Sequence, residues 1–467
     1  MGTVAGMAVT VGLASSAPAA TLTVTSERDR GAGSLRNTIE RADDGDTVRL
    51  PPGTYRVTRG ALEIEDSLTI RGAGAKRTVV DARRRSRVME ALGTDDSLRL
   101  KKLTVTGGRV EGSGAGIFTL GDLTLDRVTV RGNRVATGDF ARFGAGIAHG
   151  NGDLTLNRSV ITRNVVVGGT GQNFGAGVSM VVDGGDLRVL SSTVSNNAVT
   201  GTSGSGGGLF MSAIPTADPA NMLIRRSTFA GNSAPTAGGA LVYQQTDTSG
   251  LLTTARIVDS TISGNQAAGD SQGFGGGIYL SNVLTDDAAL LDVSVANTTV
   301  SGNVAGTPEA LGRGGGIAFE TVTLGASGAA LTINNATISG NRAFVTGSGG
   351  QGGGINVSGD PPTLSNSIVA RNRASGSPDC SAAVPSSGNN LEGATSCGFT
   401  SLGDQQDANP MLEPLRANGG PTQTRALKPG SPALNRGSNA TCEPRDQRGV
   451  IRPQGPRCDV GAYERKR

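Results

Sequence analysis

The chain has 467 residues, of which 73 are glycine, 10 phenylalanine, 4 tyrosine and none tryptophan. The formal net charge of +4 is small for this length, and no clustered basic stripe indicates a nucleic-acid partner. Beyond the first 20 residues, no segment approaches the run of about 18 apolar residues that a membrane-spanning helix needs, so we expect no transmembrane segment.

Residues 1–20 have the features of a secretory signal peptide. A short apolar run from Val4 to Ala14 is followed by the small-residue site Ala17-Pro18-Ala19. We therefore expect a protein that is secreted or held at the cell surface.

Residues 21–60 are predicted to form an N-terminal cap and the first coil of a larger array. Ser34 can cap a helix within residues 31–42, and Leu35, Ile39 and Ala42 give this helix an apolar stripe. Because a stacked array needs its open end covered, we interpret this helix as a lid.

Residues 61–375 contain a motif that recurs at intervals of 30 to 40 residues, which indicates a solenoid. Each of the eight clean copies ends in an asparagine: Asn133, Asn164, Asn197, Asn232, Asn265, Asn303, Asn341 and Asn372. Each copy is preceded by a glycine cluster closed by an aliphatic residue: Ile117, Ile147, Val178, Leu209, Leu241, Ile278, Ile317 and Ile355.

Within each copy, apolar residues alternate with polar ones at a period of two, which is typical of half-buried strands. The inward column includes Ile262, Val300 and Ile338. An outward row is rich in threonine: Thr129, Thr193, Thr228, Thr261, Thr299 and Thr337. We predict an all-β fold, a single parallel β-helix of about ten coils that is right-handed by the general crossover rule.

The repeated asparagine has two possible uses in such a fold. Asparagine tolerates the left-handed conformation of a sharp turn, and stacked side-chain amides can hydrogen-bond from coil to coil. The glycine cluster predicts a second corner, where backbones pack too closely for a Cβ atom.

Residues 376–467 lack the repeat and hold all four cysteines, so we interpret them as a C-terminal cap. Four cysteines allow three pairings. The local pairs Cys380–Cys397 and Cys442–Cys458 suit a loop-rich secreted cap, whereas the spacing and the lack of a partner histidine disfavour zinc.

Motifs in this region resemble a known family. The segment 418–434, NGGPTQTRALKPGSPAL, together with Asp446-Gln-Arg-Gly449, Arg452-Pro453 and Cys458-Asp-Val-Gly-Ala-Tyr-Glu464, resembles the choice-of-anchor Q domain of bacterial secreted β-helix proteins. The segment from Gly33 to Tyr55 is similar to the start of that group. Phe229-Ala-Gly-Asn232 and Gly238-Gly-Ala-Leu241 resemble repeats of chlamydial polymorphic outer membrane proteins. The resemblance implies a pectin-lyase-like fold and a secreted or cell-surface location.

A candidate ligand-binding patch follows from the insert between each aliphatic closer and the next strand. The insert swells to 12–14 residues in four successive coils, whose equivalent positions are neighbours in space. The inserts carry Asp218, Tyr243, Asp247, Tyr279, Asp286, Asp287, Phe319 and Glu320. The alternative is that the inserts are longer strands that thicken one wall of the solenoid.

Because the fold also hosts polysaccharide lyases and hydrolases, the residues that could catalyse such reactions matter. The candidates are Lys101 and Lys102 with Asp95 and Asp96, His149, Asp286 with Asp287, and the arginines of 452–457. We interpret each as structural, since none belongs to a complete motif. His149 falls in an inward row. No ligand motif supports Ca²⁺, so we expect no cofactor and no metal.

The sequence thus predicts an adhesin-like scaffold, a monomer that binds an extracellular polysaccharide or a cell-surface protein without catalysis. A carbohydrate-active enzyme is the alternative.

Overall fold

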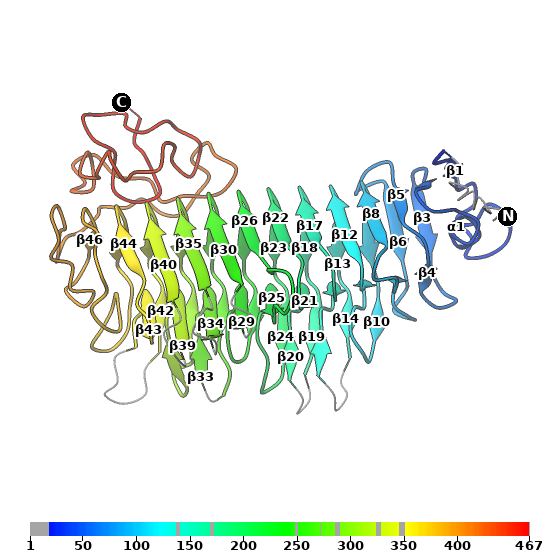
Figure 1. Cartoon of the computed structure of the whole chain (residues 1–467), viewed down its shortest axis with the longest axis horizontal. Helices are drawn as coiled ribbons and strands as arrows, with labels where there is room; N and C mark the ends of the chain where they lie inside the picture. Colours follow the sequence, from blue (N-terminus) through cyan, green and yellow to red (C-terminus); the bar gives the residue numbers. More distant parts are fainter. Residues whose placement is uncertain are drawn as a thin grey trace, which may run out of the picture.

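The computed structural model describes residues 18–136, 141–168, 172–247, 251–270, 272–284, 290–323, 328–344 and 351–466. These residues form an elongated rod of stacked coils, with the N-terminal segment at one end (Figure 1). The pairings between its strands are parallel, and four long sheets run along the rod. The predicted parallel β-helix is confirmed. The predicted signal peptide at 1–20 lies almost wholly outside the described residues.

The four sheets are numbered here in the order in which the chain crosses them within one coil. Sheet 1 consists of β1 (Thr21–Thr23), β2 (Thr47–Arg49), β5 (Leu68–Arg71), β8 (Ser97–Lys101), β12 (Asp122–Asp126), β17 (Leu154–Asn157), β22 (Leu187–Leu190), β26 (Met222–Arg225), β30 (Leu252–Val258), β35 (Leu290–Ala296), β40 (Gly328–Asn334) and β44 (Thr363–Ser365). Sheet 2 consists of β3 (Gly53–Arg56), β6 (Thr78–Asp81), β9 (Thr104–Thr106), β13 (Thr129–Arg131), β18 (Val160–Thr162), β23 (Thr193–Ser195), β27 (Thr228–Ala230), β31 (Thr261–Ser263), β36 (Thr299–Ser301), β41 (Thr337–Ser339), β45 (Ile368–Ala370) and β46 (Leu391–Glu392).

Sheet 3 is narrow and consists of β10 (Arg109–Val110), β14 (Arg134–Val135), β19 (Val165–Val167), β24 (Ala198–Thr200), β28 (Ser233–Ala234), β32 (Gln266–Ala267), β37 (Val304–Ala305) and β42 (Arg342–Ala343). Sheet 4 consists of β4 (Leu62–Ile64), β7 (Met89–Ala91), β11 (Ile117–Thr119), β16 (Ile147–His149), β21 (Val178–Val182), β25 (Leu209–Ala213), β29 (Leu241–Asp247), β34 (Ile278–Leu284), β39 (Ile317–Thr323) and β43 (Ile355–Ser358). Two small pairs join β15 (Arg142–Phe143) to β20 (Asn173–Phe174) and β33 (Gln272–Phe274) to β38 (Leu311–Arg313).

The number of coils agrees with the prediction of about ten. Among the described residues, sheet 4 has ten strands, whereas sheets 1 and 2 have twelve each. The difference arises at the ends, where β1 pairs with β2 before the repeat begins and β46 pairs with β45 after it stops. Short strands with irregular sequences complete the ends of the solenoid without showing the motif.

The interior is a column of aliphatic side chains in register. Ile262, Val300 and Ile338 are partners in successive strands of sheet 2, and all three are fully buried. The predicted inward column is therefore confirmed. Each coil adds one layer, so that every layer packs on the apolar surface of the layers above and below it.

The repeated asparagines form a buried ladder at the corner between sheets 2 and 3. Each Nδ2 donates to the Oδ1 of the next asparagine at 2.9–3.0 Å, from Asn133 to Asn372. The same Oδ1 also accepts the backbone N–H of the preceding asparagine, as Asn303 Oδ1 does from Asn265 at 3.0 Å. The predicted ladder is confirmed.

The left-handed residue at this corner is not the asparagine itself, which corrects the sequence interpretation. The positive φ belongs to the residue before it: Gly132, Arg163, Asn196, Gly231, Gly264, Gly302, Gly340 and Arg371. The reason is that the ladder asparagine must point its side chain into the interior, so the turn is made one residue earlier. Glycine is favoured there because it has no Cβ penalty at positive φ.

The glycine cluster packs against this ladder. A Cβ added to Gly277 would lie 2.6 Å from the carbonyl oxygen of Gly316 and 3.1 Å from the amide nitrogen of Asn303. Gly146 and Gly316 meet equivalent neighbours. The asparagine and the glycine of each repeat are thus two sides of one contact, which explains why they recur together.

The N-terminal end is covered as predicted, though by a shorter helix. Helix α1 (Leu35–Ile39) begins after Ser34, whose side chain accepts the backbone N–H of Asn37 at 3.3 Å. Leu35, Ile39 and Ala42 are buried and belong to the same apolar core as the coils.

The C-terminal region does more than cap the end. Residues 376–409 continue the solenoid, since Ile355 bridges to Cys380, Leu364 to Ser386 and Leu391 to Gln405. Residues 410–466, here termed the fold-back, then turn back and lie along the side of the last coils, above the strands from β30 to β44 (Figure 1). The region expected to cap the C-terminal end thus extends the solenoid and also covers its side. Both predicted disulfides, Cys380–Cys397 and Cys442–Cys458, are present.

Candidate functional site

The inserts that swell in the middle coils are mostly strand. The paired strands β29, β34 and β39 of sheet 4, and β30, β35 and β40 of sheet 1, have seven residues each. The sequence allowed two interpretations of the inserts, a ligand-binding patch or longer strands that thicken one wall of the solenoid. The described residues fit the longer strands. The connecting tips, which include Asp286 and Asp287, lie outside the described residues.

Two residues of the predicted patch lie in the core, which is a correction. Tyr243 and Phe319 are at most 1% exposed. Tyr243 pairs with Met211 and Leu280 in the inward row of sheet 4, and its hydroxyl donates to Gln245 Oε1 at 3.0 Å. Strand alternation dictates this result, because both residues stand two positions after an inward aliphatic closer.

Of the remaining patch residues, two are in contact with each other. Tyr279 and Glu320 lie on sheet 4, where the Tyr279 hydroxyl donates to Glu320 Oε2 and burial raises the pKa of Tyr279. Asp218 is exposed in the turn before β26, and Asp247 ends β29. Tyr243 and Phe319 are therefore removed from the patch, and a joint site formed by the other residues stays a prediction.

Partly buried aromatic rings gather on the outer face of sheet 4, a feature that the sequence analysis missed. Phe174 lies 5.5 Å from Phe143 and 4.4 Å from Phe210, and Phe274 lies 5.8 Å from Tyr279. Phe174, Phe274 and Tyr279 pack against a small separate core that consists of the buried residues Phe210, Ala237 and Val242.

The catalytic candidates are engaged in structural contacts or separated from one another. His149 is buried, with Nδ1 2.8 Å from Thr119 Oγ1 and Nε2 3.1 Å from the Gly152 carbonyl. Burial lowers the pKa of His149, so the imidazole stays neutral. Lys101 and Lys102 stand at the end of β8, whereas Asp95 and Asp96 precede its start. A five-residue strand separates the two pairs by about 15 Å.

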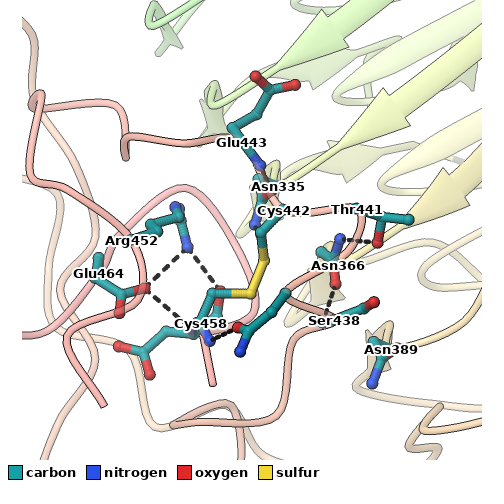
Figure 2. The surroundings of a disulfide bond; sticks show 12 residues. Asn335, Asn366, Asn389, Ser438, Thr441, Cys442, Glu443, Arg452, Cys458 and Glu464 are labelled. Atoms are coloured by element: carbon teal, nitrogen blue, oxygen red, sulfur yellow. Dashed lines mark hydrogen bonds and ion pairs between the residues drawn. A yellow bond between two sulfur atoms is a disulfide. The ribbon is translucent and has the colours of Figure 1, made fainter. Parts of the chain in front are cut away.

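Arg452 stabilises the fold-back rather than facing a cleft. Its guanidinium is buried and donates to Glu464 Oε2 at 3.1 Å (Figure 2). It also donates to the carbonyl oxygens of Asp459 and Gly461 at 2.7 Å. Burial lowers the pKa of Arg452 and raises that of Glu464. The family-like motifs at 446–464 thus supply the interior of this segment.

The fold-back covers one side of the last coils through side chains of the solenoid. The hydroxyls of Thr261 and Thr299 donate to the Gln423 carbonyl and to Gln447 Oε1 at 2.5 and 2.6 Å. Asn366 accepts the N–H of Ser438 at 2.7 Å and donates to Thr441 Oγ1 at 2.9 Å (Figure 2). Part of the threonine row that was expected to be outward is therefore buried.

A groove lies where the fold-back borders the outer face of sheet 1. It has a volume of about 680 Å³, and its walls combine hydroxyl, amide and charged groups with short apolar stretches. Its lining consists of Leu223, Arg225, Arg256, Val258, Ser294, Val295, Ala296, Thr332, Asn334, Ser365, Thr441 and Glu443. Arg225 is held by Asp259 at 3.6 Å, which leaves Arg256 as the basic group without an ion pair in this groove among the described residues. Sequence periodicity could not indicate this groove, because one wall comes from the fold-back.

No protein-family model and no curated protein matches the chain, so these comparisons support neither the choice-of-anchor Q domain nor the chlamydial repeats. Among solved structures, the chain is similar to one described as the crystal structure of pectate lyase Pel9A. The two share 15% sequence identity with a TM-score of 0.46, over 96% of this chain and 97% of that one. A likeness at this level bears on neither activity nor substrate, and the fold is established here by the strand pairing.

Two searches of the described residues give negative results. No helix there is long and apolar enough to cross a membrane, and no three His, Cys, Asp or Glu residues there group in a way that could hold a metal ion.

Proposed function

We propose that the protein is a secreted or cell-surface β-helix scaffold that binds an extracellular glycan in the groove on sheet 1, without catalysis. The observation that carries this proposal is the groove itself. It is an open trough along the rod, between the widened strands β30, β35 and β40 and the fold-back. Parallel strands repeat at about 4.8 Å, so such a trough offers a regular series of positions to a linear polymer.

The groove has the chemistry that sugar hydroxyls require. The hydroxyl groups of Ser294 and Thr332, on the successive strands β35 and β40, can donate and accept hydrogen bonds, and Thr441 adds another hydroxyl from the opposite wall. The amide of Asn334 joins the two walls, since its Nδ2 donates to the Thr441 carbonyl at 2.9 Å. Arg256 can bind an acidic or hydroxyl group of the chain. Polar groups that converge on a preformed concavity are the usual features of a ligand site.

Two further features support an extracellular location. Both disulfides require an oxidising compartment to persist, and the motifs at 418–464 resemble a domain of secreted β-helix proteins. We also expect the protein to act as a monomer and to bind a glycan or a cell-surface protein as its partner.

The test is binding of the purified protein to an immobilised panel of cellulose, chitin, dextran, polygalacturonate, alginate and hyaluronan. Ser294→Trp fills the groove without a change in charge. Thr155→Trp, in the same column of sheet 1 but four coils before Ser294, is the matched control. We expect one or more polymers to bind to wild type and to the control at least tenfold more tightly than to Ser294→Trp. Binding to no polymer, or equal binding by all three proteins, would refute the proposal.

The same incubations test the alternative function. A polysaccharide lyase would release unsaturated uronate products from polygalacturonate, alginate or hyaluronan, and a hydrolase would release reducing ends from any of the polymers. We expect neither product. A rise in absorbance from unsaturated uronates, lost in Lys101→Ala or Lys102→Ala, would establish the enzyme instead.

A further inference from the structure

A second concave site lies on sheet 1 near the opposite, N-terminal end. This pocket has a volume of about 590 Å³. Four of its lining residues are basic, namely Arg49, Arg71, Arg77 and Lys102, and none is acidic. The strands β12, β17 and β22 separate it from the strands of the groove. It is therefore independent of the proposed glycan groove.

The fold brings these basic residues together in a fixed arrangement. Arg49 and Arg71 are partners at the ends of β2 and β5, and Lys101 continues the same column on β8. The turn that begins at Gly72 is fixed to the next coil, because Gly72 and Gly74 donate backbone hydrogen bonds to the carbonyls of Lys101 and Lys102 at 2.8 Å. The pocket is thus formed before any ligand arrives.

The positive charges of the pocket are not neutralised by the protein. Among the described residues, none of the four basic side chains forms an ion pair. Like charges directly opposite each other on paired strands repel and destabilise the sheet, so the pairing of Arg49 with Arg71 has an electrostatic cost. An anionic ligand would remove this cost.

Elsewhere on the same face the chain places carboxylates beside its arginines. Arg188 lies 2.6 Å from Asp186, and Arg127 lies 3.0 Å from Asp126. Arg225 and Arg226 both contact Asp259 at 3.6 Å. Arg256 in the groove also has no ion pair among the described residues, but the pocket differs because it gathers four such basic groups with no acidic residue in its lining. This indicates that its counter-charge comes from outside the chain.

We propose that this pocket binds a multiply charged oxyanion, a phosphate or sulfate ester carried by an extracellular polymer. Arginine guanidinium groups match such oxyanions with paired hydrogen bonds, and lysine adds a point charge. A single carboxylate would neutralise only one of the four charges. The lining contains no aromatic ring on which a base could stack, which disfavours single-stranded nucleic acid.

The test compares the full-length protein with two variants that lose the same charge. Arg49→Gln/Arg71→Gln/Lys102→Gln alters the pocket, and Arg109→Gln/Arg131→Gln/Arg134→Gln alters three exposed arginines on sheets 2 and 3. The probes are inorganic polyphosphate, dextran sulfate, neutral dextran and single-stranded DNA, with binding measured by calorimetry at 0.15 M NaCl. Polyphosphate and dextran sulfate distinguish the two sources of the oxyanion.

We expect wild type to bind polyphosphate or dextran sulfate, the pocket variant to bind it at least tenfold more weakly, and the control variant to bind within twofold of wild type. Neutral dextran should not bind. The circular dichroism spectra of both variants should match wild type, since none of the substituted side chains is buried. Absence of binding to both charged polymers, equal losses in the two variants, or equally tight binding of the DNA would overturn the proposal.

Discussion

Asn372 Nδ2 donates a 2.9 Å hydrogen bond to Asp379 Oδ1, and this contact ends the ladder of eight asparagines. The carboxylate thus occupies the place of a ninth amide, at the point where the repeat stops and the C-terminal region begins. Asp379 is buried, and burial raises its pKa to about 6. The hydrogen bonds from Asn372 oppose this rise but are the smaller effect.

The first prediction is that Asp379 makes the protein less stable as pH rises. Because the native state binds this proton more tightly than the unfolded state does, the stabilising effect is complete below about pH 4 and is lost as pH rises through about 6. Asp379→Asn replaces the titrating carboxyl group by an amide, which does not bind this proton. We expect the unfolding free energy of wild type to fall relative to the variant by about 2 kcal/mol between pH 4 and pH 7. A constant difference between the two proteins across this range, measured by denaturant unfolding, would contradict the assignment.

The second prediction concerns the interior of the ladder. Asn265→Ala removes the acceptor for two groups of Asn232 and the donor to the Phe229 carbonyl and to Asn303. Because buried groups are left without partners, we expect a loss of about 3 kcal/mol. The exposed Asn151→Ala is the control and should change the unfolding free energy by less than about 0.5 kcal/mol. A similar effect of both substitutions would show that the ladder contributes nothing specific.

The third prediction concerns the apolar column. Ile262→Asp places a charge in a layer where the side chain is fully buried, at a cost of about 5 kcal/mol. Neighbouring coils should unfold with it, since each coil is stabilised only by its neighbours. Ile262→Val, which removes one methylene, should cost only about 1 kcal/mol. Circular dichroism during thermal unfolding measures both. An Ile262→Asp protein with the wild-type melting temperature would contradict the described packing.

The fourth prediction is that the fold-back can be released from the solenoid. Arg452→Met leaves Glu464 buried without its cation, and breaking a buried pair in this way costs about 3–5 kcal/mol. We expect proteases to cleave within 410–466 while the coils stay intact, because the coils keep their own core. A matched substitution at an exposed residue, Arg457→Met, should leave the segment resistant. Cleavage that destroys the whole rod at once would show that the fold-back is needed for the coils to hold together.

The sequence allowed the repeating part of the fold to be predicted but not the parts that break the repeat. The positions of the ladder asparagines, from Asn133 to Asn372, and of Ile262 could be predicted because residues one repeat apart are neighbours in a stacked array. The left-handed residue was misassigned, since an amide that bonds from coil to coil cannot also occupy the turn. The course of residues 410–466 could not be foreseen, because its contacts with Thr261 and Thr299 connect positions more than 140 residues apart.

The candidate site was predicted less well for a related reason. Tyr243 and Phe319 were assigned to a surface by their place in an insert, although the alternation of the strand directs them inward. The groove needs the fold-back as a wall, and the basic pocket combines β2, β5 and the turn after β8. Both sites therefore depend on which segments meet in three dimensions, and the pattern within one repeat does not contain that information.

The central claim is that the outer face of sheet 1 beside the fold-back binds a glycan, and hydroxyl-radical footprinting tests it most directly. The protein is labelled alone and with a polymer that binds in the panel. We predict that Leu223 and Val258, which line the groove, become protected. Phe143 and Phe174, which belong to the short strands β15 and β20 and do not line the groove, should keep their reactivity. Protection of these two rings with unchanged labelling of the groove would contradict the account.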